Sequence, residues 1–150
     1  MPGRERLVET VLLHKGYDAF LPIRRNRVRN RRRDLPLFPG YVFCQANAGV
    51  VGPLVTTPGV VRIVGYGKQP APITDSEIEN IRRVSASGNG FAHSYIERGQ
   101  RVRIINGPLR GAEGILVKES DGTRMVVSLS MLQRSVAVAI NPEWICSSAV

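Results

Sequence analysis

The amino-terminal apolar residues recur with the period of a helix. Four of them fall at positions i, i+1, i+4 and i+5: Leu7, Val8, Val11 and Leu12. This single stripe predicts a helix over residues 4–15, and Gly16 follows where a left-handed residue commonly ends a helix. The next run, residues 17–21, contains aromatic residues and stops at Pro22. That pattern favours a short strand.

A second strand is predicted over residues 41–45, where apolar residues follow a proline-rich stretch. Pro36 and Pro39 exclude regular strand pairing before Gly40, because proline lacks the N–H that a ladder requires. Between the two strands, residues 24–33 contain seven arginines and a single apolar residue. We therefore expect this segment to be the tip of a long hairpin held out by the strands 17–21 and 41–45.

The middle of the chain contains one further apolar run and one strong helix signal. Residues 60–64 follow a Pro-Gly turn and predict a strand, whereas residues 65–70, GYGKQP, lack most of a phosphate-binding loop and predict a turn. Thr74 and Glu77 have the spacing of a capping box and predict a helix that begins there. This helix should end near the Gly-rich residues 85–90, which also mark a domain boundary.

From Gly99 onward the pattern changes to short apolar runs separated by tight turns. The runs are residues 101–104, 115–117, 125–127 and 136–140. Because each is too short to stand alone, a small closed or nearly closed barrel is expected. The chain is thus predicted to be of the α+β class, with an antiparallel sheet and flanking helices in residues 1–86, a linker at 87–96 and an all-β barrel in residues 97–150.

Length and charge restrict the possible functions. The 150 residues allow one ordinary domain or two small ones, and 21 Lys and Arg against 12 Asp and Glu give a net charge of +9. This excess favours polyanions or acidic protein surfaces as partners. No apolar run approaches the roughly 20 residues of a membrane helix, and the start lacks a signal-peptide core. A cytoplasmic protein without membrane contact is expected.

Few side chains suit catalysis or metal binding. His14 and His93 have no neighbouring residues that resemble a nucleophile elbow, a catalytic triad or a zinc site. Cys44 and Cys146 match no metal-ligand spacing and are too few for a disulfide framework, which indicates a reducing cytosol. Cys44 is expected to pack as a small apolar residue in a strand, and Cys146 to lie in the tail. We expect the protein to have no enzymatic activity and to bind neither a metal nor a cofactor.

The arginine-rich segment is the strongest candidate for a binding site. A solvated hairpin tip is one interpretation, but mutual repulsion among so many guanidinium groups, with Asp34 as the one nearby carboxylate, favours contact with phosphates. Such contact would be independent of base sequence and strongly salt-dependent. The candidate nucleic-acid-binding residues are Arg24, Arg25, Arg27, Arg29, Arg31, Arg32 and Arg33.

Residues 36–43, PLFPGYVF, are the second candidate. Tyr41 or Phe43, whichever faces the helices, should be core, because a strand buries alternate residues. The opposite face could leave an exposed apolar patch of the kind that marks a protein–protein site. Phe38 is the residue that we expect outside, with burial in the core as the open alternative.

The order of these motifs is similar to that in a known family. LPLFPGYVFCQA, followed by VTTPGVVRIVGYGKQPAPITDSEIENI, resembles the amino-terminal (NGN) domain of NusG transcription elongation factors and their antiterminator paralogues of the RfaH type. GQRVRIINGPLRGAEGILV resembles the KOW motif of the same family, and the match covers nearly the whole chain. The residues that match the KOW motif are Gly99, Val102, Gly107, Pro108, Gly111 and Gly114.

The resemblance implies a fold and partners. An NGN domain would sit on the clamp helices of RNA polymerase and suppress pausing, and an SH3-like KOW barrel would recruit Rho or a small-subunit ribosomal protein. By position, Phe38, Tyr41 and Phe43 would contact the polymerase, and the arginine hairpin would lie near upstream or non-template DNA. Met131 and Leu132 fall in the barrel loop that would meet the second partner. A monomer without cofactors is expected.

The chain also departs from this family. Relatives begin with a strand that carries a Trp-Tyr pair, whereas this sequence starts at Met1-Pro2-Gly3, so that one central strand is expected to be missing. A misplaced chain start or a truncated, non-functional copy would each explain this. A ribosome-associated KOW protein that binds folded RNA is a further alternative. The apolar residues 36–43 count against it, because a pure RNA binder needs no such patch.

Overall fold

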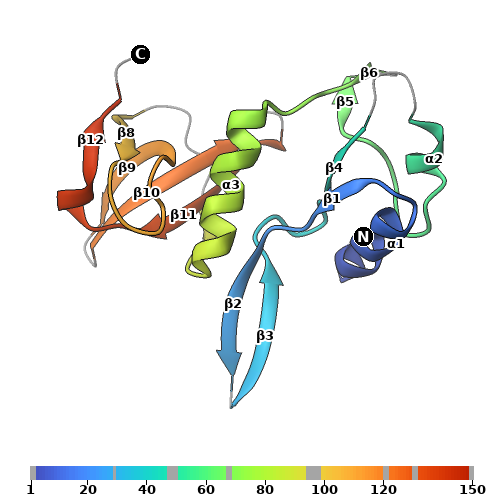
Figure 1. Ribbon diagram of the computed structural model, residues 1–150, viewed down its shortest axis with the longest axis horizontal. Helices are drawn as coiled ribbons and strands as arrows, with labels where there is room; N and C mark the ends of the chain where they lie inside the picture. Colours follow the sequence, from blue (N-terminus) through green and yellow to red (C-terminus); the bar gives the residue numbers. More distant parts are fainter. Residues whose placement is uncertain are drawn as a thin grey trace. The chain divides into compact units, whose positions relative to one another are not determined.

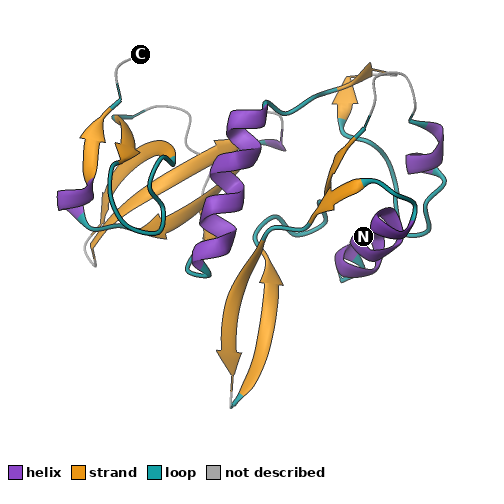
Figure 2. Ribbon diagram, viewed as in Figure 1, coloured by secondary structure: helices purple, strands orange, loops and turns teal. Residues whose placement is uncertain are grey.

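The computed structural model describes residues 3–28, 30–46, 51–66, 69–93, 99–119, 122–129 and 132–148, with their side chains except those of residues 26–28, 32, 92 and 93. The chain divides into two compact units (Figure 1). The first comprises Met1–Pro22 and Phe38–Ala71, and the second comprises Ile23–Leu37 and Pro72–Val150. The mixture of helices and antiparallel sheets confirms the predicted α+β class (Figure 2).

The first unit contains two helices and two small antiparallel sheets. Its elements are α1 (Glu5–His14), β1 (Asp18–Phe20), β4 (Phe43–Gln45), α2 (Gly52–Val55), β5 (Gly65–Tyr66) and β6 (Gln69–Pro70). β1 pairs with β4, and β5 pairs with β6. The helix predicted over residues 4–15 and the pairing of strands 17–21 and 41–45 are confirmed. The helix α2 was not predicted.

The core of the first unit lies between α1, β1 and α2. Its buried side chains are Val8, Leu12, Ala19 and Leu54. Val8 and Leu12 are one helical turn apart, as the apolar stripe predicts, although Leu7 of the same stripe is exposed. The strand predicted over residues 60–64 is wrong, because these residues lie outside every strand of the described chain. Val60 and Ile63 instead pack against the core as partly buried side chains.

The second unit joins an arginine-rich hairpin, one long helix and a six-stranded sheet. Its elements are β2 (Ile23–Val28), β3 (Arg31–Pro36), α3 (Asp75–Ser87), β7 (Phe91–His93), β8 (Arg101–Ile104), β9 (Glu113–Glu119), β10 (Gly122–Leu129), β11 (Arg134–Ala139), a 3-10 helix (Pro142–Trp144) and β12 (Ile145–Ser147). The sheet is antiparallel in the order β12-β8-β9-β10-β11-β7. This sheet is consistent with the small barrel-like domain that was predicted.

Two strands of this sheet were not predicted. β7 falls inside the segment expected to be a linker, and its backbone pairs with β11. β12 falls in the expected tail, where Cys146 lies opposite Arg103 of β8. Three-residue strands carry too little periodicity to be detected in the sequence, and their positions are set by the edges that they cover. The predicted domain boundaries at 86 and 97 stay a prediction.

Helix α3 begins as its capping box predicts and packs on the sheet. The Thr74 Oγ1 accepts a hydrogen bond from the Glu77 N–H at 3.3 Å, and the Thr74 N–H donates to the Glu77 carboxylate at 3.1 Å. The side chains of Ile81 and Val84 are fully buried. On the same helix, the Asn80 Oδ1 accepts a hydrogen bond from the Glu113 N–H at 3.1 Å. Polar and apolar contacts therefore join α3 to the sheet within the second unit.

Candidate functional site

The arginine-rich segment forms a regular two-stranded hairpin rather than only its tip. β2 and β3 pair from Ile23 opposite Pro36 to Val28 opposite Arg31, which leaves Arg29 and Asn30 as the connection. Asn30 has φ +61°, a left-handed conformation that asparagine tolerates in tight hairpin turns. The expectation that Pro36 is excluded from strand pairing is wrong. Pro36 is the last residue of β3, where a missing N–H is tolerated.

The base of this hairpin is bonded to the carboxyl end of α3. The Ser85 Oγ accepts a hydrogen bond from the Ile23 N–H at 2.9 Å and donates one to the Ile23 carbonyl at 3.1 Å. The Arg25 N–H donates to the Gly88 carbonyl at 3.2 Å. These bonds occupy the outer edge of β2 at its first residues, Ile23 and Arg25. The hairpin therefore leaves α3 in a defined direction and offers no free edge there for another strand.

The predicted nucleic-acid-binding arginines are spread along both strands. Arg25, Arg31 and Arg33 are exposed and Arg24 is half-buried. The side chains of Arg27 and Arg32, and the whole of Arg29, lie outside the described residues. The hairpin thus brings at least four guanidinium groups onto one ribbon, an arrangement suited to an extended row of phosphates.

The PLFPGYVF segment turns its rings inward. The expectation that Phe38 is exposed is wrong, because its side chain is 1% exposed. Its ring meets that of Phe43 edge-on, with centroids 5.7 Å apart, and Phe43 is also buried. The Tyr41 N–H donates to the Phe38 carbonyl at 3.1 Å, and Gly40 between them has φ +87°. This Pro-Gly turn directs Phe38 into the core and leaves Pro39 and Gly40 exposed, with Tyr41 half-buried.

A buried carboxylate holds this turn. The Glu5 side chain is 5% exposed and accepts hydrogen bonds from the Gly40 N–H at 2.8 Å and the Gly3 N–H at 2.6 Å. Burial acts to raise the pKa of Glu5, but the backbone N–H groups of Glu5, Gly40 and Gly3 outweigh it and lower that pKa. The ionised carboxylate therefore ties the start of α1 to the PLFPGYVF turn.

The residues of the KOW motif build a turn at the end of β8. Val102 is buried, and the Gly111 N–H donates to the Ile104 carbonyl at 2.8 Å. Gly107 has φ +81°, and a Cβ there would lie 2.4 Å from the Trp144 ring. A Cβ on Gly114 would lie 2.6 Å from the Val126 carbonyl oxygen. These glycines are required by close packing, so this part of the motif has a structural role.

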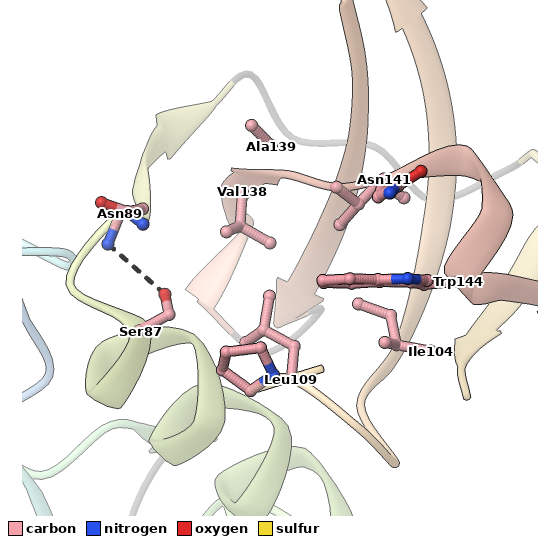
Figure 3. Close-up of a pocket in the computed structure, with 10 residues that line it drawn as sticks. Ser87, Asn89, Ile104, Leu109, Val138, Ala139, Asn141 and Trp144 are labelled. Atoms are coloured by element: carbon pink, nitrogen blue, oxygen red, sulfur yellow. Dashed lines mark hydrogen bonds between the residues drawn. The ribbon is translucent and has the colours of Figure 1, made fainter. Parts of the chain in front are cut away.

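The end of helix α3, the KOW turn and Trp144 line an open pocket of about 290 Å³ (Figure 3). Ser87 and Asn89 line it from the end of α3, where the Asn89 N–H donates to the Ser87 Oγ at 3.3 Å. Pro108 and Leu109 of the KOW turn line it as well, together with Trp144 of the 3-10 helix. No charged side chain occurs among the ten residues that line this pocket.

Of the two residues predicted to meet a partner of the barrel, only Leu132 belongs to the described part of the chain. Leu132 is buried in the turn before β11, and Met131 lies outside the described residues. Their contact with a partner stays a prediction.

The remaining candidate side chains that the structure describes lie apart from one another. Cys44 lies half-buried in β4 against the core, as predicted, and burial, with the Asp18 carboxylate as a second cause, raises the pKa of its thiol. Within the described ranges, no three His, Cys, Asp or Glu side chains are placed to hold a metal ion. His14 is exposed, and the side chain of His93 lies outside the described residues. None of the helices described is long and apolar enough to cross a membrane.

Glu5 and Ser85 are the two positioning residues that sequence reasoning missed. Glu5 lies in the first turn of a helix. Acidic residues are common there because they interact favourably with the helix dipole, so the position by itself does not indicate a further role. Ser85 belongs to a stretch of small residues that indicates a boundary. Their partners, Gly40 and Ile23, are 35 and 62 residues away in the chain, and no local signal points to them.

Comparisons with known proteins agree with the motifs. The family model "NusG: Transcription termination factor nusG" matches residues 1–82. The chain is 33% identical over 118 residues to the transcription termination/antitermination protein NusG of Pseudomonas aeruginosa. This alignment covers 75% of the present chain and 67% of the relative. The protein of the same name from Borreliella burgdorferi is 27% identical over 141 residues, with 83% and 77% covered.

A solved structure supports the fold. The structure described as "Domain interaction in Thermotoga maritima NusG" superposes with a TM-score of 0.58 at 22% identity, and the alignment covers 98% of this chain and 92% of that one. The family model extends over more than half of the chain, and the Pseudomonas relative matches over two thirds of its own length. The chain therefore belongs to the NusG family of transcription termination factors.

Proposed function

We propose that the protein is a transcription elongation and antitermination factor that binds the clamp of RNA polymerase and the backbone of nearby DNA. The observation that carries this proposal is the arginine hairpin, an ordered ribbon bonded to α3 at its base with exposed guanidinium groups along its length. Family membership and the names of the relatives, which are termination/antitermination proteins, support a role in transcription. The protein acts by binding and not by catalysis.

The hairpin supplies the contact with DNA. Each guanidinium group offers a planar fork of donors that matches phosphate oxygens, and such contacts carry no base preference. A factor held in this way remains bound as the polymerase moves through different sequences. Its affinity falls as salt rises, because counterions released from the phosphates drive part of the binding.

The PLFPGYVF turn supplies the contact with the polymerase. Its solvent-facing part is Pro39, Gly40 and the half-buried Tyr41, whereas Phe38 and Phe43 form the packed base beneath. We assign the direct contact to Tyr41 and a supporting role to the two phenylalanines. A factor bound to the clamp favours elongation over pausing only if it binds the closed polymerase more tightly than the paused one. The size of the effect equals that difference in binding free energy.

The barrel is the site for a further protein partner. Rho or a small-subunit ribosomal protein, approaching near Met131 and Leu132, is the partner that the KOW motif suggests. The partner would contact neighbours of Leu132 in the turn, because the Leu132 side chain itself is buried.

Titration of the purified chain with core RNA polymerase at about physiological salt tests the proposal. Tyr41→Ala should weaken binding several-fold, whereas Tyr66→Ala, which removes an exposed tyrosine from the same unit, should not. Equal affinity of both variants would place the polymerase contact elsewhere. Absence of polymerase binding together with tight binding of folded ribosomal RNA would favour the ribosome-associated alternative.

A further inference from the structure

We propose that the described arginines on the two faces of the hairpin have different roles: Arg24, Arg31 and Arg33 bind the phosphates of duplex DNA, whereas Arg25 belongs to the anchor on α3. This inference rests on the proposed contact between the hairpin and nucleic acid. It concerns the four arginines whose side chains the structure describes.

The strand register separates these arginines into two rows. Residues directly opposite each other in an antiparallel pair share one face, and the faces alternate along each strand. Arg24 is opposite Leu35, Arg33 is opposite Asn26 and Arg31 is opposite Val28. These six positions form one row, and none of them is Asp or Glu. The row therefore carries uncompensated positive charge.

Arg25 lies in the other row and has different surroundings. It stands directly opposite Asp34, which is a favourable pairing of opposite charges across the strands. Its aliphatic stem passes over the end of α3, because a Cβ on Gly88 would lie 3.0 Å from the Arg25 Cδ. Its N–H donates to the Gly88 carbonyl, at the negative end of the helix dipole. Both the aliphatic stem and the backbone N–H of Arg25 thus serve the attachment of the hairpin, and Asp34 opposite it offsets part of its charge.

The dimensions of the first row suit duplex DNA. Arg31 and Arg33 are two residues apart on one strand, a separation of about 6.8 Å, which equals the axial rise of about two nucleotides of one DNA strand. A two-stranded ribbon fits the major groove, which is about 12 Å wide. Residues 23–36 contain no aromatic side chain on which an unpaired base could stack. Charge and shape therefore favour the duplex backbone over a single strand.

A matched series of methionine variants tests the assignment, because methionine keeps an unbranched apolar stem and removes the charge. The whole chain, as wild type and as Arg24→Met, Arg25→Met, Arg31→Met and Arg33→Met, is titrated with a fluorescent duplex of mixed sequence at several salt concentrations. Arg24→Met, Arg31→Met and Arg33→Met should each reduce the slope of log affinity against log salt by about 1. Arg25→Met should leave the slope unchanged.

The possible outcomes distinguish a failure of this assignment from a failure of the proposed DNA contact itself. A slope that falls as much in Arg25→Met as in Arg31→Met would overturn the division into two faces while leaving the hairpin as a DNA contact. A wild-type chain without salt-dependent DNA binding would reject the proposed function itself. Tighter binding to the single strand of the same oligonucleotide, with the same loss of slope, would overturn the assignment to duplex DNA.

Discussion

The PLFPGYVF segment and the β2–β3 hairpin, the two proposed interfaces, are built in opposite ways. The segment buries Phe38 and Phe43 and is held by the carboxylate of Glu5. The hairpin exposes Arg25, Arg31 and Arg33 and is held through its backbone by Ser85 and Gly88. One interface keeps its large side chains inside the unbound protein, and the other presents them to water.

The difference follows from the cost of hydration. An aromatic ring in water loses the free energy that burial would supply, so a folded chain turns such rings inward unless a partner covers them. A guanidinium group is well hydrated and can remain exposed until phosphates replace the water. We therefore expect substitutions in the segment to change stability first, and substitutions in the hairpin to change binding first.

The largest effect is expected for Phe38→Ala. Loss of a fully buried ring should lower the free energy of unfolding by about 3–5 kcal/mol, measured by urea denaturation. Tyr66→Ala, at a side chain that is 74% exposed, is the control and should change stability by less than about 0.5 kcal/mol. A Phe38→Ala protein of unchanged stability that binds polymerase poorly would show that Phe38 is a surface residue after all.

Glu5→Gln should have the next largest effect, and it should depend on pH. A hydrogen bond to a charged acceptor contributes about 1.5–3 kcal/mol, and the Glu5 carboxylate accepts two of them at neutral pH, which the neutral amide of glutamine would replace with weaker bonds. Because the pKa of Glu5 is lower in the folded chain than in the unfolded one, this contribution is complete above the unfolded pKa and is lost as pH falls through the folded pKa.

The measurement for Glu5 is the free energy of unfolding of both proteins between pH 7 and about pH 3. The difference between wild type and Glu5→Gln should shrink below about pH 4. A difference that stays constant with pH would mean that the charge of Glu5 does not hold the turn. The amide proton of Gly40, followed by NMR, should titrate with the same pKa.

Ser85→Ala should weaken the base of the hairpin without removing any arginine. Each of its two hydrogen bonds to Ile23 contributes about 0.5–1.5 kcal/mol. Faster hydrogen exchange at the Ile23 amide and a several-fold loss of DNA affinity are expected, because a loosened ribbon must be ordered on binding. Ser147→Ala, at an exposed serine of β12, is the control. Unchanged exchange at Ile23 would show that Ser85 does not anchor the hairpin.

The smallest effect is expected at the other end of α3. Thr74→Ala removes the side-chain cap and should lower the free energy of unfolding by about 1 kcal/mol, whereas Thr74→Ser should restore most of it. DNA affinity should be the same in both variants, since the cap lies about three turns of helix from Ser85. Loss of DNA affinity in Thr74→Ala alone would mean that the hairpin depends on the whole helix and not on its end.

Local signals account for the elements that were predicted correctly. The capping box of Thr74 and Glu77, the stripe containing Val8 and Leu12, and the apolar runs of β8 to β11 each specify a helix or strand within a few residues. Elements without such a signal were missed. β7 and β12 have three residues each, and they form strands because β11 and β8 offer edges to pair with.

The candidate sites show the same division. That residues 24–33 form a basic hairpin is evident from charge and from the strands on either side, but its anchoring by Ser85 and its separation into two rows required the register. In the PLFPGYVF segment, the composition allowed Phe38 to be either core or surface. The Pro-Gly turn and its hydrogen bond to Glu5 decided that it is core.

The sequence by itself determined the class of fold, the position of α1 and α3, the basic hairpin and the family, because each depends on residues that are neighbours in the chain. The tertiary structure decided which aromatic rings are buried, which arginine lies against a helix end, and why Gly107 has no room for a side chain. These depend on groups brought together from distant positions. Their free energies come from burial and from specific hydrogen bonds that exist only once the chain has folded.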